Sequence, residues 1–174
     1  MAIGSAGSRL LAVMRHAKAE PAGPTDYDRP LAARGDRDAR NAGAWLSEVG
    51  FEPEYALVSA ALRTRETWAA VAHGAGWDLD PDYDRGMYAA GPETALDMVR
   101  GIDDDVRRLL VIGHNPTMAL LAQLLDDGDA EPELSDELFA GYPTSAVAVF
   151  AYDGSWADLA EGSARLVAFH VGRG

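Results

Sequence analysis

Short apolar runs alternate with longer amphipathic stretches along most of this chain. An uninterrupted apolar run with polar flanks is typical of a strand buried on both faces of a parallel sheet. Three stretches fit this pattern: 10–15, 55–59 and 108–113. Apolar residues at three-to-four spacing predict helices over 32–49, 62–75, 93–102 and 116–125. Two β-rich segments close the chain, 145–152 and 164–171, and we expect them to pair antiparallel at one edge.

Strands that alternate with helices indicate an α/β protein. We predict a three-layer α/β/α sandwich with a mostly parallel central sheet. A length of 174 residues fits one domain with a core of its own. We place this domain at residues 9–174 and interpret residues 1–8 as a flexible N-terminal tail.

In three segments the apolar residues follow neither the spacing of a helix nor that of a strand. Residues 17–30 form a polar, proline-punctuated loop that is long enough to reach over the end of the sheet. Residues 77–92 are predicted to be irregular, because Pro81 and Gly86 disfavour an edge strand there. Residues 126–137 are predicted to be an acidic, solvated loop.

Two predicted helices depend on single residues. Asn115 offers an N-cap and Pro116 the favoured first helical position for the helix that ends near Leu125. Gly43 lies inside the predicted helix over 32–49, although glycine is a poor helix former.

The composition narrows the function classes. Fifteen basic and twenty-eight acidic residues give a formal charge of −13, which argues against binding to nucleic acid or to anionic membranes. The chain has no cysteine, so disulfides, thiolate zinc sites and a cysteine nucleophile are excluded. The start of the chain does not resemble a signal peptide, and no stretch has the ~20 apolar residues of a membrane span. We expect a cytoplasmic protein.

Two of the predicted strands end in a histidine, His16 and His114. Ligands of α/β proteins bind at the carboxyl ends of parallel strands, so both imidazoles are expected to face one crevice. Arg15 precedes the first histidine, and Arg63 follows the strand over 55–59. A guanidinium group donates two parallel hydrogen bonds to phosphate oxygens, and a neutral imidazole can attack phosphorus. The pattern predicts a phosphoryl pocket with His16 as nucleophile and Arg15, Arg63 and His114 as its stabilising groups.

Other interpretations of the same residues stay open. A single strand-end histidine is more often structural than catalytic. A phosphate-binding module without catalysis would use the same arginines. A metal site made from His16, His114 and acidic residues of 78–84 is disfavoured, because arginines repel a divalent cation. Arg29 and Lys18 are weaker candidates for the rim of the pocket, whereas we interpret Arg65 as solvated and His73 and His170 as structural or surface residues.

Three segments together resemble the histidine phosphatase superfamily, which includes the phosphoglycerate mutases. They are Met14-Arg15-His16-Ala17, Ser59-Ala-Ala-Leu-Arg63-Thr-Arg-Glu-Thr67 and Val111-Ile-Gly-His114-Asn-Pro. The Arg-His-Ala-Lys start, the run Asp28-Arg29-Pro30-Leu31 with Gly35, and the late Pro143-Thr144-Ser145-Ala146 are similar to small phosphohistidine phosphatases of the SixA type.

This resemblance implies a phosphoglycerate mutase-like fold and phosphatase activity with His16 as the phosphorylated residue. It also implies that Arg15, Arg63 and His114 complete the phosphate pocket and that no metal or organic cofactor is needed. Larger members carry a glutamate proton donor between the second and third segments. Residues 82–88 do not match it, which leaves Asp84 and Glu93 as weak candidates. Because a phosphorylated imidazole leaves more readily than an alkoxide, we predict a phosphohistidine on a protein as substrate. A small phosphorylated metabolite is the alternative.

Overall fold

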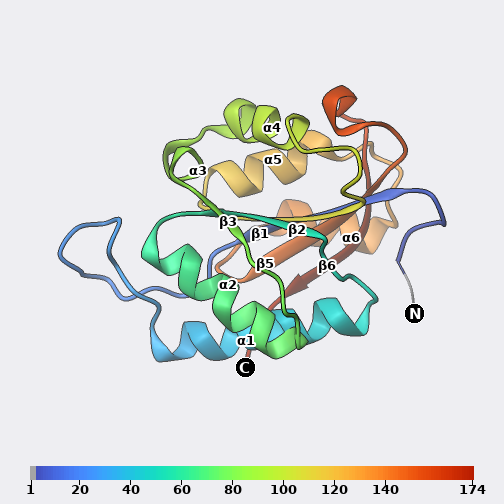
Figure 1. Ribbon diagram of the computed structural model, residues 1–174. Helices are drawn as coiled ribbons and strands as arrows, with labels where there is room; N and C mark the ends of the chain where they lie inside the picture. Colours follow the sequence, from blue (N-terminus) through green and yellow to red (C-terminus); the bar gives the residue numbers. More distant parts are fainter. Residues whose placement is uncertain (1–2) are drawn as a thin grey trace.

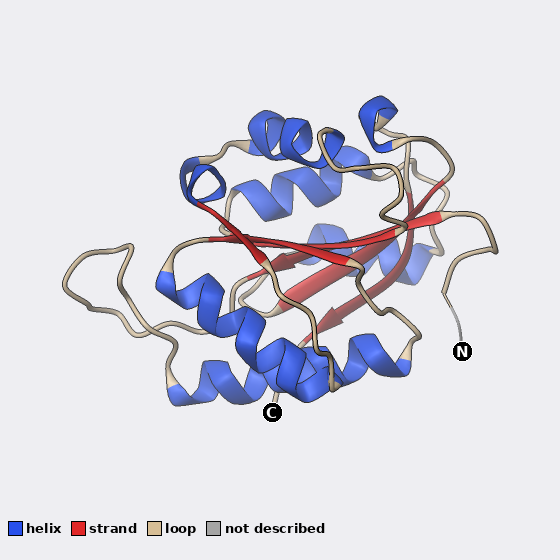
Figure 2. Ribbon diagram, viewed as in Figure 1, coloured by secondary structure: helices blue, strands red, loops and turns tan. Residues whose placement is uncertain are grey.

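A single six-stranded sheet forms the centre of the computed structural model, which describes residues 3–174 (Figures 1 and 2). In chain order its strands are β1 (Arg9–Arg15), β2 (Tyr55–Ser59), β3 (Asp82–Asp84), β4 (Arg108–Gly113), β5 (Ala146–Tyr152) and β6 (Arg165–Val171). Their spatial order is β3-β2-β4-β1-β5-β6. Neighbours from β3 to β1 pair in parallel, whereas β5 pairs antiparallel with both β1 and β6. The predicted edge pair of 145–152 and 164–171 is confirmed.

Helices cover both faces of this sheet (Figure 2). On one face lie α1 (Ala33–Glu48) and α2 (Leu62–Ala75), and on the other lie α4 (Pro92–Arg100), α5 (Thr117–Leu125) and α6 (Pro132–Ala140). Alternate residues of β1 serve the two layers, because Leu11 and Val13 pack in one core cluster and Ala12 and Met14 in the other. This two-sided burial explains the uninterrupted apolar run, and the prediction of a three-layer α/β/α sandwich is confirmed.

The predicted irregular segment 77–92 is partly wrong. Residues 82–84 form β3, a short edge strand beside β2, and Arg85–Ala89 form the single-turn helix α3. Pro81 lies just before the strand and interrupts no pairing, while Asp84 accepts a hydrogen bond from the Gly86 N–H at 2.6 Å and so caps α3. The two residues that argued against regular structure therefore lie at positions that tolerate them.

The predicted acidic loop 126–137 is also wrong over its second half, where α6 begins at Pro132. Pro132 takes the first helical position, Glu133 lies in the first turn, and Leu138 is fully buried against the core. A single apolar stripe stabilises this helix, and its acidic residues hid that stripe in the sequence.

The start of α5 differs slightly from the prediction. Pro116 occupies the N-cap position and the helix begins at Thr117. The Asn115 side chain still serves the first turn, because its Oδ1 accepts a hydrogen bond from the Ala119 N–H at 3.2 Å.

The flexibility expected of the N-terminal tail, residues 1–8, stays a prediction. Residues 1–2 lie outside the described part of the chain. Ile3 packs against the core cluster on the α1 side, and the Ser8 hydroxyl donates to Asp153 at 2.6 Å. Among residues 3–174 there is no helix with the length and apolar character required to cross a bilayer.

The contact between α1 and α2 explains why a glycine, Gly43, lies inside a helix. A Cβ at Gly43 would overlap the carbonyl oxygen of Val71 in α2, and a Cβ at Gly74 would overlap the carbonyl oxygen of Arg40 in α1. The two helices therefore cross backbone to backbone, with a glycine from each at the contact. This close approach holds α2, and with it Arg63, against the rest of the fold.

We predict that Gly43→Ala destabilises the protein, although alanine is the better helix former. The helices must separate to admit the methyl group, which should lower the free energy of unfolding by about 1–3 kcal/mol. Equilibrium urea unfolding measures this change. Gly91→Ala is the matched control, since a Cβ there meets nothing within 4 Å. If both variants are as stable as the native chain, the helix crossing is not as tight as described.

Candidate active site

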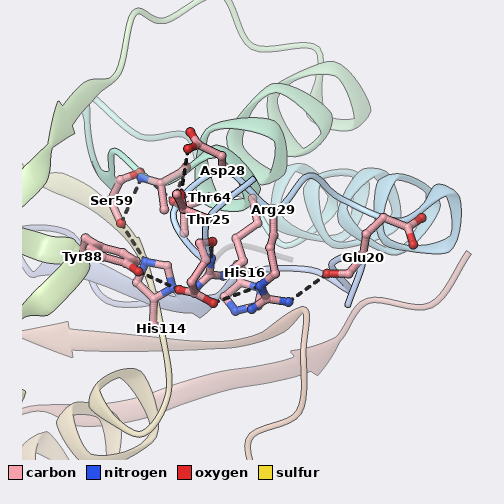
Figure 3. Close-up of polar contacts among 12 residues, drawn as sticks. His16, Glu20, Thr25, Asp28, Arg29, Ser59, Thr64, Tyr88 and His114 are labelled. Atoms are coloured by element: carbon pink, nitrogen blue, oxygen red, sulfur yellow. Dashed lines mark hydrogen bonds and ion pairs between the residues drawn. The ribbon is translucent and has the colours of Figure 1, made fainter. Parts of the chain in front are cut away.

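The four predicted residues lie at the carboxyl ends of the central strands. Figure 3 shows two of them, His16 and His114. Arg15 ends β1 and His16 follows it, Arg63 lies in the first turn of α2 directly after β2, and His114 follows β4. Because β1 and β4 are neighbours in register, the His16 N–H donates to the Gly113 carbonyl at 3.0 Å. The rings of His16 and His114 lie 5.4 Å apart, measured between their centroids.

His16 is held as a neutral imidazole with one nitrogen free. Its Nδ1 lies 2.7 Å from the Ala17 carbonyl, and because a carbonyl can only accept, Nδ1 carries the hydrogen. The lone pair is therefore on Nε2. Burial lowers the pKa of His16 to about 4; the Ala17 bond opposes this effect, and the charges of Arg63, Arg15 and Arg29 reinforce it. At neutral pH Nε2 is a competent nucleophile.

His114 is also neutral. Burial lowers its pKa to about 3, with further contributions from His16 and Arg63. Its Nε2 lies 2.7 Å from the hydroxyl of Ser59, the last residue of β2. Its Nδ1 is buried and has no hydrogen-bond partner within the described chain.

The two arginines combine fixed and free donors. Arg63 is only 5% exposed, and its Nη1 donates to the carbonyl oxygen of Asp26 at 2.7 Å. Arg15 donates from Nη1 to the Tyr142 carbonyl at 3.2 Å. The Nε atoms of both arginines are buried without a partner, as is Nδ1 of His114. A buried polar group without a partner costs about 1–3 kcal/mol, and an anion with several acceptor oxygens would satisfy both guanidinium N–H groups. It would also satisfy Nδ1 of His114 in the tautomer whose Nε2 accepts from the Ser59 hydroxyl.

Tyr142 joins the site to the C-terminal half of the chain. Its carbonyl accepts from Arg15 and also from the Asn115 side-chain amide, the latter at 2.8 Å. Its buried hydroxyl donates to the Val13 carbonyl of β1 and accepts from the Ala148 N–H of β5 at 3.1 Å. Tyr142 therefore fixes the side chain of Arg15 and is itself held by β1 and β5.

Sequence reasoning missed Asp26 and Tyr88. The Asp26 carboxylate accepts from Tyr88 Oη at 2.6 Å, from Arg29 Nε at 2.9 Å and from Arg63 Nη2 at 3.2 Å. The Tyr88 bond, with help from both arginines, lowers the pKa of Asp26 to about 2. The Tyr88 ring meets the His114 ring edge-on at 5.4 Å. The only sequence signal was that Asp26 lies two residues before the run that begins at Asp28.

The weaker candidates separate into two groups. Arg29 reaches the site through Asp26, whereas Lys18 and Arg65 are exposed, and Arg65 lies over the Tyr83 ring. His73 is exposed, and His170 stacks on Trp45 and bonds to Asn41, so both are outside the site.

Neither carboxylate suggested as proton donor contacts the four residues within the described chain. Asp84 caps α3, and Glu93 lines a groove between α4 and α5 together with Leu96 and Leu120. No three His, Asp or Glu side chains of residues 3–174 come together in a way that could hold a metal ion. The two histidines therefore lack the carboxylate of 78–84 that the metal interpretation required.

Known proteins resemble this chain over most of its length. A family model of the histidine phosphatase superfamily (branch 1) matches residues 11–87. An uncharacterized protein of Mycobacterium tuberculosis is 41% identical over 162 residues, 92% of this chain and 100% of that protein. The structure of a candidate phosphohistidine phosphatase SixA from Nakamurella multipartitia has a TM-score of 0.83 at 34% identity, and covers 96% of this chain and 98% of its own. A SixA candidate from Agrobacterium tumefaciens has a TM-score of 0.77 at 29% identity, with coverages of 93% and 97%.

The buried neutral His16 predicts a fold that loses stability in mild acid. An unfolded histidine has a pKa of 6.5, against about 4 for folded His16. Below pH 6.5 the unfolded chain binds the proton first, so this stability is complete above pH 6.5 and is lost as the pH falls towards 4. Between pH 7 and pH 5 the loss from His16 is about 2 kcal/mol.

Urea unfolding of the native chain and of His16→Gln at both pH values measures this loss. The variant should lose about 2 kcal/mol less than the native chain. His73→Gln, which replaces an exposed histidine of α2, is the control and should behave like the native chain. An equal loss in the native chain and in His16→Gln would contradict a neutral buried imidazole at position 16.

Proposed function

The chain belongs to the histidine phosphatase superfamily and is a phosphatase of the SixA type, and from this premise we propose that it hydrolyses phosphohistidine on a protein through a phosphorylated His16. The observation that carries the proposal is the state of His16. Its Nδ1–H is fixed on the Ala17 carbonyl, its Nε2 carries the lone pair, and the neighbouring Arg15, Arg63 and His114 each have a buried nitrogen without a partner in the described chain.

The reaction has two displacements. Nε2 of His16 attacks phosphorus, a P–N bond forms, and the bond between phosphorus and the leaving group breaks with its electron pair on that group. His16 then carries the phosphoryl group on Nε2 and a hydrogen on Nδ1. Water attacks phosphorus in the second step, the P–Nε2 bond breaks, and neutral His16 and inorganic phosphate result, with the proton of water released to phosphate or solvent.

Arg15, Arg63 and His114 have one shared role in this proposal. Their buried nitrogens donate to the nonbridging phosphoryl oxygens, whose charge spreads in the transition state. Because Tyr142 and Asp26 already fix the two guanidinium groups, little reorganisation is needed when the phosphoryl group arrives.

Two properties favour a protein substrate over a small metabolite. No glutamate proton donor stands beside the histidines in the described chain, which suits a leaving group as good as imidazole. The SixA candidates that resemble this chain are named for phosphohistidine. The charge of −13 argues against nucleic acid as a partner and fits a location in the cytoplasm, which we include in the proposal.

We predict that a labelled phosphodonor leaves its label on His16. Brief exposure followed by quenching should trap an adduct that is labile in acid and stable in base, as expected of a phosphoramidate. Peptide mapping should locate the label at His16. A label that is stable in acid, or that maps to another residue, would contradict the proposed mechanism.

His16→Ala separates an enzyme from a binding module. Loss of the nucleophile should lower kcat for a phosphohistidine peptide by more than about 10³-fold, and His73→Ala should leave it unchanged. Binding of the phosphopeptide, measured by calorimetry, should survive in His16→Ala because the arginines remain. If the native chain binds the peptide without hydrolysing it, the protein is a phosphate-binding module.

A further inference from the structure

The backbone carbonyl of Asp26 fixes Arg63, but its carboxylate also lies at the site and has no part in the two displacements. We propose that Asp26 is a catalytic residue whose carboxylate accepts a hydrogen bond from the protonated distal ring nitrogen of the phosphohistidine that is being cleaved. The inference rests on the proposed function and specifies it, since it assigns the leaving group as a neutral imidazole, released from a protonated phosphohistidine, rather than an alkoxide or a phenoxide.

The chemistry of the leaving group creates the need for such a residue. When the distal ring nitrogen of a phosphohistidine carries a proton, the ring is an imidazolium. The P–N bond then breaks with its electron pair on the departing nitrogen, the proton stays on the distal nitrogen, and a neutral imidazole leaves. No proton is transferred in this step, so a general acid is not required. The step requires only that the distal nitrogen keep its proton, and a carboxylate acceptor raises the share of phosphohistidine in this reactive imidazolium form at neutral and higher pH.

The same arrangement already exists for the other imidazole of the reaction. His16 holds its Nδ1–H against the Ala17 carbonyl at 2.7 Å, so phosphorylated His16 can leave as a neutral imidazole in the second step. The phosphoryl group thus passes between two imidazoles, each of which must keep an N–H. Ala17 supplies the acceptor for the enzyme's ring, and Asp26 supplies it for the substrate's ring.

Asp26 has the position and the charge for this role. It contacts Arg63 through both its backbone carbonyl and its carboxylate, and it shares Tyr88 with the His114 ring. The neighbouring Tyr27 carbonyl accepts from the Leu62 N–H at 2.9 Å, which fixes this part of the loop on the start of α2. The Asp26 side chain is 57% exposed, so a ring that enters from solvent can reach its carboxylate. Its lowered pKa keeps it ionised at neutral pH.

Other carboxylates nearby have different partners. Asp28 accepts from the Thr25 hydroxyl at 2.8 Å, Glu66 from the Leu31 N–H at 2.9 Å, and Asp84 caps α3. Of these, none bonds to a residue of the phosphate pocket within the described chain. Of these four carboxylates, Asp26 is therefore the one that bonds to the phosphate pocket, and its side chain is open to solvent.

The experiment compares two leaving groups in Asp26→Asn. From a protonated phosphohistidine peptide the leaving group is a neutral imidazole. From 4-nitrophenyl phosphate it is the 4-nitrophenolate anion, which has no N–H for a carboxylate to accept. On the alkaline side of the pH profile, where protonation of the ring limits the rate, the variant should lose about 10-fold in kcat for the peptide, which corresponds to a lowering of the ring pKa by about one. It should keep or increase kcat for the ester. The alkaline limb of kcat for the peptide should also move to lower pH, since nothing then holds the imidazolium proton.

Asp28→Asn is the matched control, because it removes a carboxylate from the same loop that does not contact the pocket. It should leave both substrates and the pH limb unchanged. An equal loss of both activities in Asp26→Asn would show that Asp26 only positions Arg63, and no loss would show that it has no role; either result overturns the inference while the phosphohistidine proposal stands. If the native chain cleaves the ester but not the peptide, the proposed substrate itself is wrong.

Discussion

The parallel pairing of β1 with β4 is the constraint on which the site depends. Arg15 lies opposite Gly113, and the next residue of each strand is a histidine, so the ladder itself places the two rings side by side. The bond from the His16 N–H to the Gly113 carbonyl continues this ladder one residue beyond the strand. A shift of one residue would turn one ring to the opposite layer. Both strands are buried on both faces, and this burial fixes their register.

Much of this arrangement could be predicted because it follows from local pattern. The apolar runs of β1, β2 and β4 gave the sheet, and the rule that strand ends converge gave His16, His114 and their arginines. Helix α6 was missed because Leu138 is its only fully buried side chain, in a stretch otherwise rich in acidic residues. Asp26 and Tyr88 could not be found this way. Their contact crosses 62 positions and depends on the path of a loop and of a single-turn helix, neither of which has a period.

The balance of charge at the site differs from that of the whole molecule. The chain carries −13, yet Arg15 and Arg63 disfavour protonation of both imidazoles, and Arg29 also disfavours that of His16. Burial is the largest influence on both histidines, so the enclosure of the rings matters more than the neighbouring charges. The site therefore combines two properties that oppose each other in water, a neutral nucleophile and a strong attraction for anions.

The residues that support the site extend along the chain to Tyr142, well beyond the four predicted site residues. The four predicted site residues all lie at or before His114, and the family model matches only as far as residue 87. Yet the carbonyl that fixes Arg15 belongs to residue 142, and its ring is anchored between β1 and β5. A fragment cut after α5 would retain all four signature side chains and lose the support that orients one of them. Such a fragment would score as a family member while lacking a formed phosphate pocket.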